Sequence, residues 1–579
     1  MAAVMRLRTA TPTAKERPSA SGIAALDTAK LRGGYYTSLR VAGWLCDWAV
    51  RNASDVVLEP SCGDGVFLEA AVGRLLALGA RPAEVARQLC AVEIISAEAR
   101  SASARLKPAL GSGARKIVRN ADFFEWWQEP GRPDFDVVIG NPPFIRFQSF
   151  PEPHRARAMA IMGGAGLSPN RLTNIWAPFV VAAVASLKAN GRLALVLPAE
   201  ILQVAYAAQL RSFLTDRFAR IDVIACNELF FEYAEQEVVL LLADRARAGS
   251  GKDCRVALTE ARTVSGIVGS SPALLLKRAR PKTIRHESEK WLKYFLSDRQ
   301  ISFLRAIREA GVTAPMSAHA DIRVGVVTGK NEFFVLSAGQ VKALGLERCV
   351  TPLVSRAAHL AGSRISAADL RVLAKAGERV HLLDIGPGKI SAKLWRYIKD
   401  GEQRGFHKGY KCSIRHPWYH VPSVWAPDGF VFRQIYEFPR MVLNASKASS
   451  TDAIHRLRSR GAAPELIIAN AYTWLTAASA EIEGRSYGGG VLELEPTEAG
   501  RLLMPARLGL GLPLKQVDAL VRAGRLDDAL KENARLILGD HMGLSASEQR
   551  LLKGVWTKMR ERRNSRRRNA GNAARENEP

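Results

Sequence analysis

The sequence of 579 residues predicts a two-domain α/β protein whose first half forms an open, doubly wound sheet. Three observations support this prediction. Short apolar runs, typical of strands covered on both faces, recur at residues 56–58, 91–94, 118–122 and 136–140. A polar group stands at the end of each run, as in sheets that build a ligand crevice from their strand ends. The chain is also too long for one such domain, so we expect a second core after it.

The first predicted strand, residues 56–58, runs into the loop from Glu59 to Leu68. Gly63 and Gly65 permit a tight turn and a close ligand approach before the next helix, although a lone Gly-x-Gly pair is a weak signal. The second strand ends in Glu93, about thirty residues further on. In a doubly wound sheet this is the position expected for an acid that binds a ribose.

The last of the four strands stops at the tetrapeptide Asn141-Pro142-Pro143-Phe144. Prolines cannot continue a sheet, so the strand must end there. The Asn141 side chain and the Pro142 carbonyl supply two acceptor oxygens, and Phe144 supplies a flat apolar face. This combination suits a planar substrate with an exocyclic amine, such as adenine. A simple turn is the alternative interpretation, because Asn-Pro dipeptides often start turns.

Five segments resemble, in order and spacing, the motif series of gamma-type, TaqI-like adenine-N6 DNA methyltransferases: Gly34 to Thr37, Glu59 to Leu68, Val92 to Ile94, Asp122-Phe123, and Asn141 to Phe144. The resemblance covers about residues 30 to 245. It implies a Rossmann-like S-adenosylmethionine-dependent methyltransferase domain followed by a mixed α+β DNA-recognition domain. It also implies a bacterial, cytoplasmic, DNA-associated enzyme of a restriction-modification or phage-defence system. Double-stranded DNA is then the substrate, and a separately encoded restriction endonuclease is the suggested partner.

The same resemblance assigns site residues. S-adenosylmethionine is expected to contact Tyr36, Thr37, Glu59, Cys62, Gly63, Glu93, Ile94, Asp122 and Phe123. Within this set, Glu93 takes the ribose hydroxyls and Asp122 accepts from the cofactor's adenine amine. The carboxylates suit a cofactor that carries a sulfonium and an ammonium charge. Each acid by itself is more often a helix cap or a surface acid, and only the set together favours a cofactor site. The chain departs from many relatives in having Ile95-Ser96 where they place Asp-Pro, so the apolar contact to adenine differs here.

The expected catalytic residues are Asn141, Pro142, Pro143, Phe144 and Phe231. Phe231 matches the second ring that stacks on the target base, and Phe230 is the competing candidate. The target amine is inaccessible inside duplex DNA, so the base must be flipped out. Positioning and electrostatics are then the main contributions to catalysis, and no metal or covalent enzyme intermediate is required.

Composition agrees with a nucleic-acid substrate. The formal net charge is +27 and the isoelectric point is about 10.1, which favours polyanionic partners. Ribosomal and membrane-surface proteins share such a charge, so it does not identify DNA. The seven cysteines include no Cys-x-x-Cys pair, which argues against zinc and against a disulfide framework. No apolar run reaches the length of a membrane span.

The expected organisation is a flexible lead (1–30), a methyltransferase domain (31–247), a linker (248–300), a target-recognition domain (301–550) and a basic disordered tail (551–579). Residues 322–335 predict a hairpin that turns at Gly329 to Asn331, and residues 410–419 alternate cations with aromatic rings, as nucleic-acid surfaces do. We assign scaffold roles to Gln203, Tyr206 and Arg211, which follow the next predicted strand.

Three alternatives remain open from the sequence. The same tetrapeptide serves enzymes that methylate a protein glutamine or an RNA guanine, although these usually lack a long C-terminal domain. The chain is alternatively a DNA-binding specificity subunit with a vestigial methylase core, against which the intact Asn141, Glu93 and Asp122 argue. A nuclease in the same chain is disfavoured, because we find no convincing Asp…Glu-x-Lys cluster.

Overall fold

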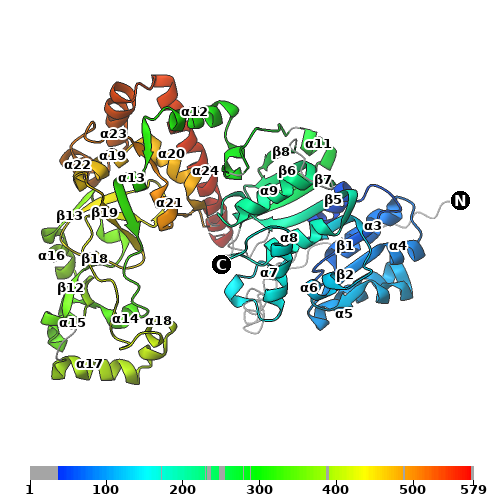
Figure 1. Cartoon of the computed structure of the whole chain (residues 1–579), viewed down its shortest axis with the longest axis horizontal. Helices are drawn as coiled ribbons and strands as arrows, with labels where there is room; N and C mark the ends of the chain where they lie inside the picture. Colours follow the sequence, from blue (N-terminus) through cyan, green and yellow to red (C-terminus); the bar gives the residue numbers. More distant parts are fainter. Residues whose placement is uncertain are drawn as a thin grey trace.

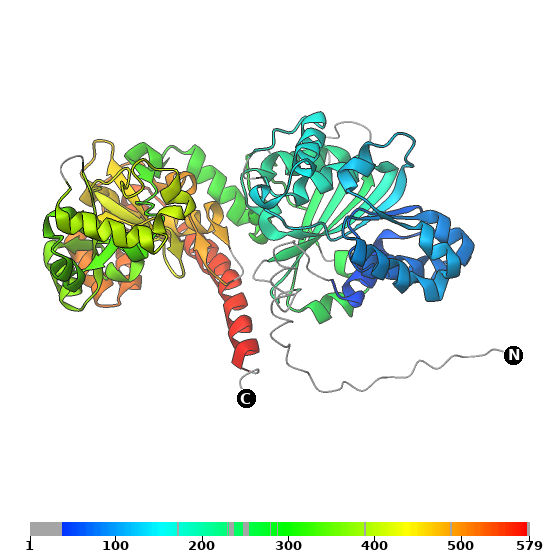
Figure 2. The same ribbon diagram turned by 90° about the horizontal axis from the view of Figure 1, so that it is seen from below.

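The computed structural model describes residues 37–170, 173–228, 230, 237–246, 254–277, 279–286, 288–386, 390–486 and 489–575. They form two lobes that lie side by side (Figures 1 and 2). We call the lobe built on strands β1 to β8 the first lobe and the lobe built on β9 to β22 the second lobe. No helix in these ranges is both long enough and apolar enough to cross a membrane.

The first lobe contains one eight-stranded sheet in the order β3-β2-β1-β4-β5-β7-β6-β8. Every neighbouring pair is parallel except the two pairs that include β7. The strands are β1 (Val57–Glu59), β2 (Leu89–Glu93), β3 (Val118–Asn120), β4 (Phe135–Gly140), β5 (Leu187–Pro198), β6 (Phe218–Cys226), β7 (Val238–Ala246) and β8 (Arg255–Ala261). The first four confirm the predicted strands. The strand order reverses between β1 and β4, which is where such sheets bind ligands.

Helices cover this sheet in two packed groups. One group is α2 (Leu39–Ala49), α3 (Val66–Ala77), α4 (Pro82–Gln88) and α5 (Ser96–Leu110), and the other is α6 (Phe123–Gln128), α7 (His154–Gly164), α8 (Trp176–Ala185) and α9 (Ala207–Arg217). Residues 176–184 of α8 are all buried, which explains why that helix is apolar on every side. The doubly wound α/β fold predicted from the strand pattern is therefore present.

The first lobe extends beyond the predicted boundary at residue 247. Strand β8 pairs with β6 along its whole length, from Arg220 opposite Arg255 to Cys226 opposite Ala261. Two further helices, α10 (Val264–Val268) and α11 (Pro272–Lys277), pack on α2. The prediction of a linker from 248 was wrong for these segments. The glycine-rich stretch at 249–251 suggested a boundary, but the chain returns to the sheet after it.

The second lobe mixes strands and helices, as predicted. Its main sheets have the orders β10-β19-β15-β17-β13 and β11-β14-β12-β18. Their strands are β10 (Ala320–Arg323), β19 (Ile454–Ser459), β15 (Gly429–Phe432), β17 (Met441–Ala445), β13 (Arg364–Ser366), β11 (Val335–Ser337), β14 (Arg379–Leu383), β12 (Val350–Val354) and β18 (Ser449–Ser450). Short strands complete two smaller sheets: β16 (Gln434–Ile435), β21 (Leu492–Glu493), β20 (Arg485–Ser486), β22 (Leu503–Pro505) and β9 (Thr313–Pro315).

The helices of the second lobe surround these sheets. The longer ones are α12 (Asp298–Glu309), α15 (Ala338–Leu344), α16 (Ala367–Lys375), α17 (Ala392–Gln403), α19 (Pro464–Ala471), α20 (Trp474–Glu483), α22 (Leu514–Arg522), α23 (Leu526–Asn533) and α24 (Ala546–Arg575). The π-helical segment Ala534–His541 follows α23 directly.

The predicted hairpin at residues 322–335 is not formed. Strand β10 pairs with β19 and strand β11 pairs with β14, and the short helix α14 (Asn331–Phe334) lies between β10 and β11. Phe333 and Phe334 are buried in a separate apolar cluster, where the Phe333 ring stacks on Tyr397 at 4.6 Å. Burial of these two rings draws the chain into a second core instead of a local turn.

The prediction of disorder from residue 551 was also wrong, because α24 continues to Arg575. The run of arginines suggested a solvated tail, yet Arg562 and Arg563 are only 7% and 1% exposed. Each guanidinium meets buried carboxylates from segments far away in the sequence. Sequence patterning does not reveal such partners.

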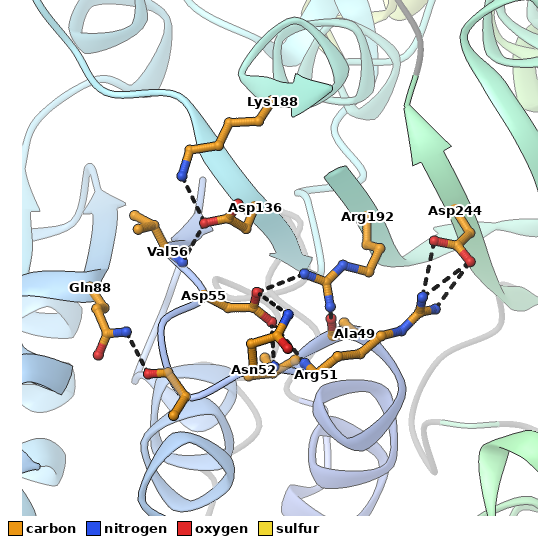
Figure 3. Close-up of polar contacts among 12 residues, drawn as sticks. Ala49, Arg51, Asn52, Asp55, Val56, Gln88, Asp136, Lys188, Arg192 and Asp244 are labelled. Atoms are coloured by element: carbon orange, nitrogen blue, oxygen red, sulfur yellow. Dashed lines mark hydrogen bonds and ion pairs between the residues drawn. The ribbon is translucent and has the colours of Figure 1, made fainter. Parts of the chain in front are cut away.

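A polar network joins the amino ends of β1, β4 and β5 (Figure 3). Arg192 of β5 donates to Asp55 at 2.8 Å and to the Ala49 carbonyl at 2.6 Å. Both members of the Arg192–Asp55 pair are buried. Burial would raise the pKa of Asp55, but hydrogen bonds from Arg192 and from two backbone N–H groups hold it below its ordinary value.

We predict that Asp55→Asn lowers the free energy of unfolding by about 3–5 kcal/mol, because it leaves the Arg192 charge buried without a counter-charge. The stabilisation from Asp55 is present above its ordinary pKa of 3.8 and is lost as the pH falls through the lower folded-state pKa. Urea denaturation at neutral and acid pH measures both effects.

Asp244→Asn is the matched control. Asp244 pairs with Arg51 at 3.2 Å in the same region, but the Arg51 side chain is 43% exposed. An exposed pair of this kind contributes about 0–1 kcal/mol. Equal losses in the two variants would contradict the special role of the buried pair.

Candidate active site

The carboxyl ends of β3, β2, β1 and β4 are neighbours in the sheet and bring the predicted site residues to one edge. The Cys62 N–H donates to the Val92 carbonyl at 3.0 Å, so the loop after β1 is tied to the end of β2. Gly65 has a φ of +86°, and a Cβ there would lie 2.9 Å from Ala102 of α5. Glycine is therefore required for the loop to pass this helix.

The Glu93 carboxylate also binds the loop after β1. One of its carboxylate oxygens accepts from the Gly63 N–H at 2.9 Å, and the other accepts from the Ile95 N–H at 2.7 Å. Burial raises the pKa of Glu93, although these two N–H groups oppose the shift. Ile94, the next residue, is 52% exposed and presents an apolar side chain at the sheet edge.

Glu59, the last residue of β1, is 1% exposed, and its Oε2 atom has no hydrogen-bond partner in the described part of the chain. Burial raises the pKa of Glu59 well above its ordinary value, and the carboxylates of Asp64 and Glu93 raise it further. Gly140 has a φ of +146°, and a Cβ there would lie 3.4 Å from the Glu59 side chain. The ends of β1 and β4 thus meet closely at this buried acid.

Cys62 is 4% exposed, and burial together with Glu59 and Glu93 raises the pKa of its thiol far above the ordinary value. The thiol therefore stays protonated and is no nucleophile. Among the described residues, no group of three or more His, Cys, Asp or Glu is arranged to hold a metal ion.

Asp122 caps α6 by accepting from the Phe124 N–H at 3.0 Å. Its other oxygen lies 2.7 Å from His154 Nδ1 and 3.4 Å from Arg157 Nη1, both on α7. These two partners were not predicted from the sequence, because a strand and the tetrapeptide separate them from Asp122 along the chain. Phe123 turns its ring into the core, where it stacks on Phe179 at 5.0 Å.

The tetrapeptide begins directly after β4. The Asn141 side-chain N–H₂ donates to Thr37 Oγ1 at 3.4 Å, and the Ser61 hydroxyl lies 3.5 Å from the Asn141 carbonyl. Thr37 and the loop after β1 are therefore joined to the tetrapeptide. Pro142 is buried, Pro143 is half-buried, and the Phe144 side chain is 9% exposed.

Two predicted site residues, Tyr36 and Phe231, lie outside the described residues. Phe230, the alternative to Phe231, is half-buried and packs against the core of the first lobe. The choice between the two rings remains a prediction.

Comparison with known proteins shows which families the chain resembles. The model of the Eco57I restriction-modification methylase matches residues 80–230, and the model of the C-terminal domain of Type II methyltransferase M.Eco57I matches residues 288–538. The chain is 23% identical to Type II methyltransferase M.AccI of Acinetobacter calcoaceticus over 88% of this chain and 90% of the relative. It is 24% identical to M.XamI of Xanthomonas campestris pv. amaranthicola over 82% and 85%.

Among solved structures, the Type IIL restriction-modification enzyme MmeI in complex with DNA is similar in fold, with a TM-score of 0.50 and 14% sequence identity. The similarity covers 91% of this chain and 72% of that chain. The two family models match consecutive parts of the chain, the methylase model first and the C-terminal model second. The alignment with M.AccI covers most of this chain and most of that relative. The chain therefore matches, in two consecutive parts, the domains of the Eco57I-type restriction-modification methylases.

Proposed function

We propose that this restriction-modification methylase transfers a methyl group from S-adenosylmethionine to the N6 amine of an adenine flipped out of duplex DNA. The observation that carries the proposal is the placement of Asn141 to Phe144 at the end of β4, beside Thr37 and next to the strand ends that bear Glu59 and Glu93. The RNA and protein substrates that the tetrapeptide left open gain no support, since both matched family models describe restriction-modification enzymes.

The residues at the sheet edge fit the cofactor. Glu59 is a buried acid whose Oε2 meets no donor among the described residues, and a cationic ligand would supply the missing charge. Glu93 is already held by two backbone N–H groups, so its carboxylate is fixed in place for the ribose hydroxyls. The exposed Ile94 offers an apolar contact for the adenine ring, and Asp122 offers an acceptor for its amine. S-adenosylmethionine, when bound, supplies the electrophilic methyl group.

The residues of the tetrapeptide act on the target amine. The lone pair of adenine N6 is delocalised into the ring, so the free amine is a poor nucleophile. Hydrogen bonds from the amine to the Asn141 side-chain oxygen and the Pro142 carbonyl favour a pyramidal nitrogen and localise this pair. The two prolines fix the backbone that carries these acceptors, which lowers the cost of orienting the base.

The expected setting follows from the relatives. Those reported above are bacterial Type II methyltransferases, so we propose that this chain acts on DNA in a bacterial cytoplasm. A separately encoded restriction endonuclease that cleaves the same DNA sequence is the proposed partner.

We predict that Asn141→Ala lowers the rate of methyl transfer by about 10²–10³-fold, the usual cost of removing one preorganised polar group. The dissociation constant of S-adenosylmethionine should change little, because the acids at the other strand ends remain. Transfer of a labelled methyl group to duplex DNA and calorimetric titration of the cofactor measure the two quantities. Unchanged turnover would refute the assigned role.

We predict that the affinity for S-adenosylmethionine rises with pH in the acid range. Glu59 binds its proton more tightly than an ordinary acid in the free protein, whereas a cationic ligand favours the ionised form, so binding releases a proton. Glu59→Gln should flatten this dependence and weaken binding at neutral pH by about 10-fold, the value of a charge-assisted hydrogen bond. Titrations between mildly acid and neutral pH test this, and parallel curves for the two proteins would exclude Glu59 as the titrating group.

A further inference from the structure

The C-terminal helix α24 runs along the second lobe and reaches the first lobe (Figures 1 and 2). It lies beyond residue 538, where the matched family model of the C-terminal domain ends. Two consecutive arginines near its middle, Arg562 and Arg563, are buried and contact different parts of the protein. This helix is therefore a candidate for a connection between the lobes.

Arg563 anchors α24 in the second lobe. Its guanidinium lies 2.7 Å from the Glu481 carboxylate of α20, and it donates to the Gly490 carbonyl at 2.6 Å and the Tyr436 carbonyl at 2.8 Å. The Arg563 and Glu481 side chains are 2% and 3% exposed. This pair fixes the direction in which the neighbouring residue points.

Arg562 reaches the first lobe. It donates to Glu237 at 2.8 Å and forms an ion pair with Glu260 of β8 at 3.0 Å. Its guanidinium also lies 3.6 Å from the centroid of the Phe295 ring. The Arg562 and Glu237 side chains are 5% and 7% exposed, so the contact is shielded from water.

A second contact between the lobes involves Gln203. Its side-chain amide donates to the Ser486 carbonyl at 3.0 Å and accepts from the Ser486 N–H at 2.9 Å. Gln203 is 3% exposed and follows β5 of the first lobe, whereas Ser486 lies in β20 of the second lobe. A two-way hydrogen bond to one backbone unit restricts both distance and orientation.

Both contacts lie at the edge of the sheet that carries the tetrapeptide. The Glu237 carbonyl accepts from the Ala199 N–H at 2.8 Å, directly after β5 ends. Strand β5 is also the neighbour of β4, whose end carries Asn141. The contacts between the lobes and the proposed methylation site therefore both lie near the carboxyl ends of the neighbouring strands β4 and β5.

We propose that Arg562 and Gln203 are positioning residues that hold the second lobe in a fixed orientation relative to Asn141. The inference rests on the proposed function. DNA that is bound by the second lobe then presents its flipped base to the tetrapeptide at a defined distance. Catalysis by positioning is sensitive to small displacements, so loosening this connection slows methyl transfer after DNA has bound.

The test compares full-length variants at saturating duplex DNA. Arg562→Met removes the charge but keeps a side chain to pack on Phe295, and Gln203→Met removes both hydrogen bonds at similar volume. Arg562→Lys keeps the charge and loses the planar fork, so it should recover part of the rate. Arg560→Met is the matched control, because its ion pair with Glu437 at 3.4 Å and its contact with the Trp556 ring at 4.5 Å both lie within the second lobe.

We expect the single-turnover rate, normalised to the number of S-adenosylmethionine-binding sites, to fall by about tenfold or more in Arg562→Met and Gln203→Met. The cofactor dissociation constant and the rate of Arg560→Met should stay near the wild-type values. Small-angle X-ray scattering should show a larger radius of gyration for both slow variants, which a loss of folded protein alone would not produce at an unchanged number of cofactor sites.

Wild-type rates per cofactor site together with unchanged scattering would overturn the proposal. An equal loss of rate in Arg560→Met would overturn it as well, since the effect would then belong to the helix in general. If the wild-type chain transfers no methyl group to DNA, the proposed function fails, and the scattering comparison still tests the docking of the lobes.

Discussion

The first lobe depends on how it buries carboxylates at the two ends of the strands of an otherwise apolar sheet. At the amino ends of β1, β4 and β5, Asp55 meets Arg192 and two backbone N–H groups, so the buried charge is satisfied and the edge is purely structural. At the carboxyl ends, Glu59 is equally buried, but its Oε2 lacks a donor in the described part of the chain. An unmatched buried acid costs stability, and it persists where a ligand supplies the missing partner. The amino ends of the strands thus hold a satisfied acid, and the carboxyl ends hold the acid that we propose to bind the cationic cofactor.

The acid that follows β3 has basic side-chain partners within the protein. Asp122 meets His154 and Arg157, which both lie on α7. This helix follows the tetrapeptide in sequence and packs between α6 and α8. The chain that follows Asn141 therefore comes back, through α7, to Asp122, the acid proposed to bind the cofactor's adenine. The two halves of the proposed reaction centre are linked through the chain as well as across the sheet, so a change in α7 affects both.

The first four strands and the residues at their ends were predictable, because each follows a local pattern: an apolar run, then a polar group, then in two cases glycine or proline. Asn141, Glu93 and Glu59 were singled out because five such patterns follow one another in order along the chain. What remained hidden depends on contacts between distant segments. The roles of His154 and Arg157 follow from their contact with Asp122, and the role of β8 follows from its pairing with β6. Neither contact is visible in the sequence. Residues 322–335 show the same limit, because their alternating pattern suits a hairpin while the burial of Phe333 and Phe334 favours a separate core.

The large positive charge also requires reinterpretation, since part of it is used inside the protein. Arg192, Arg562 and Arg563 neutralise buried carboxylates. Within residues 410–419, Arg415 donates to the Thr328 carbonyl at 2.8 Å, whereas Lys411 and the 74%-exposed Tyr410 face solvent. Phosphate contacts require cations that keep their donors in water until DNA arrives. Net charge therefore overstates the positive surface available to DNA, and exposed cations such as Lys411 are the part of it that faces solvent.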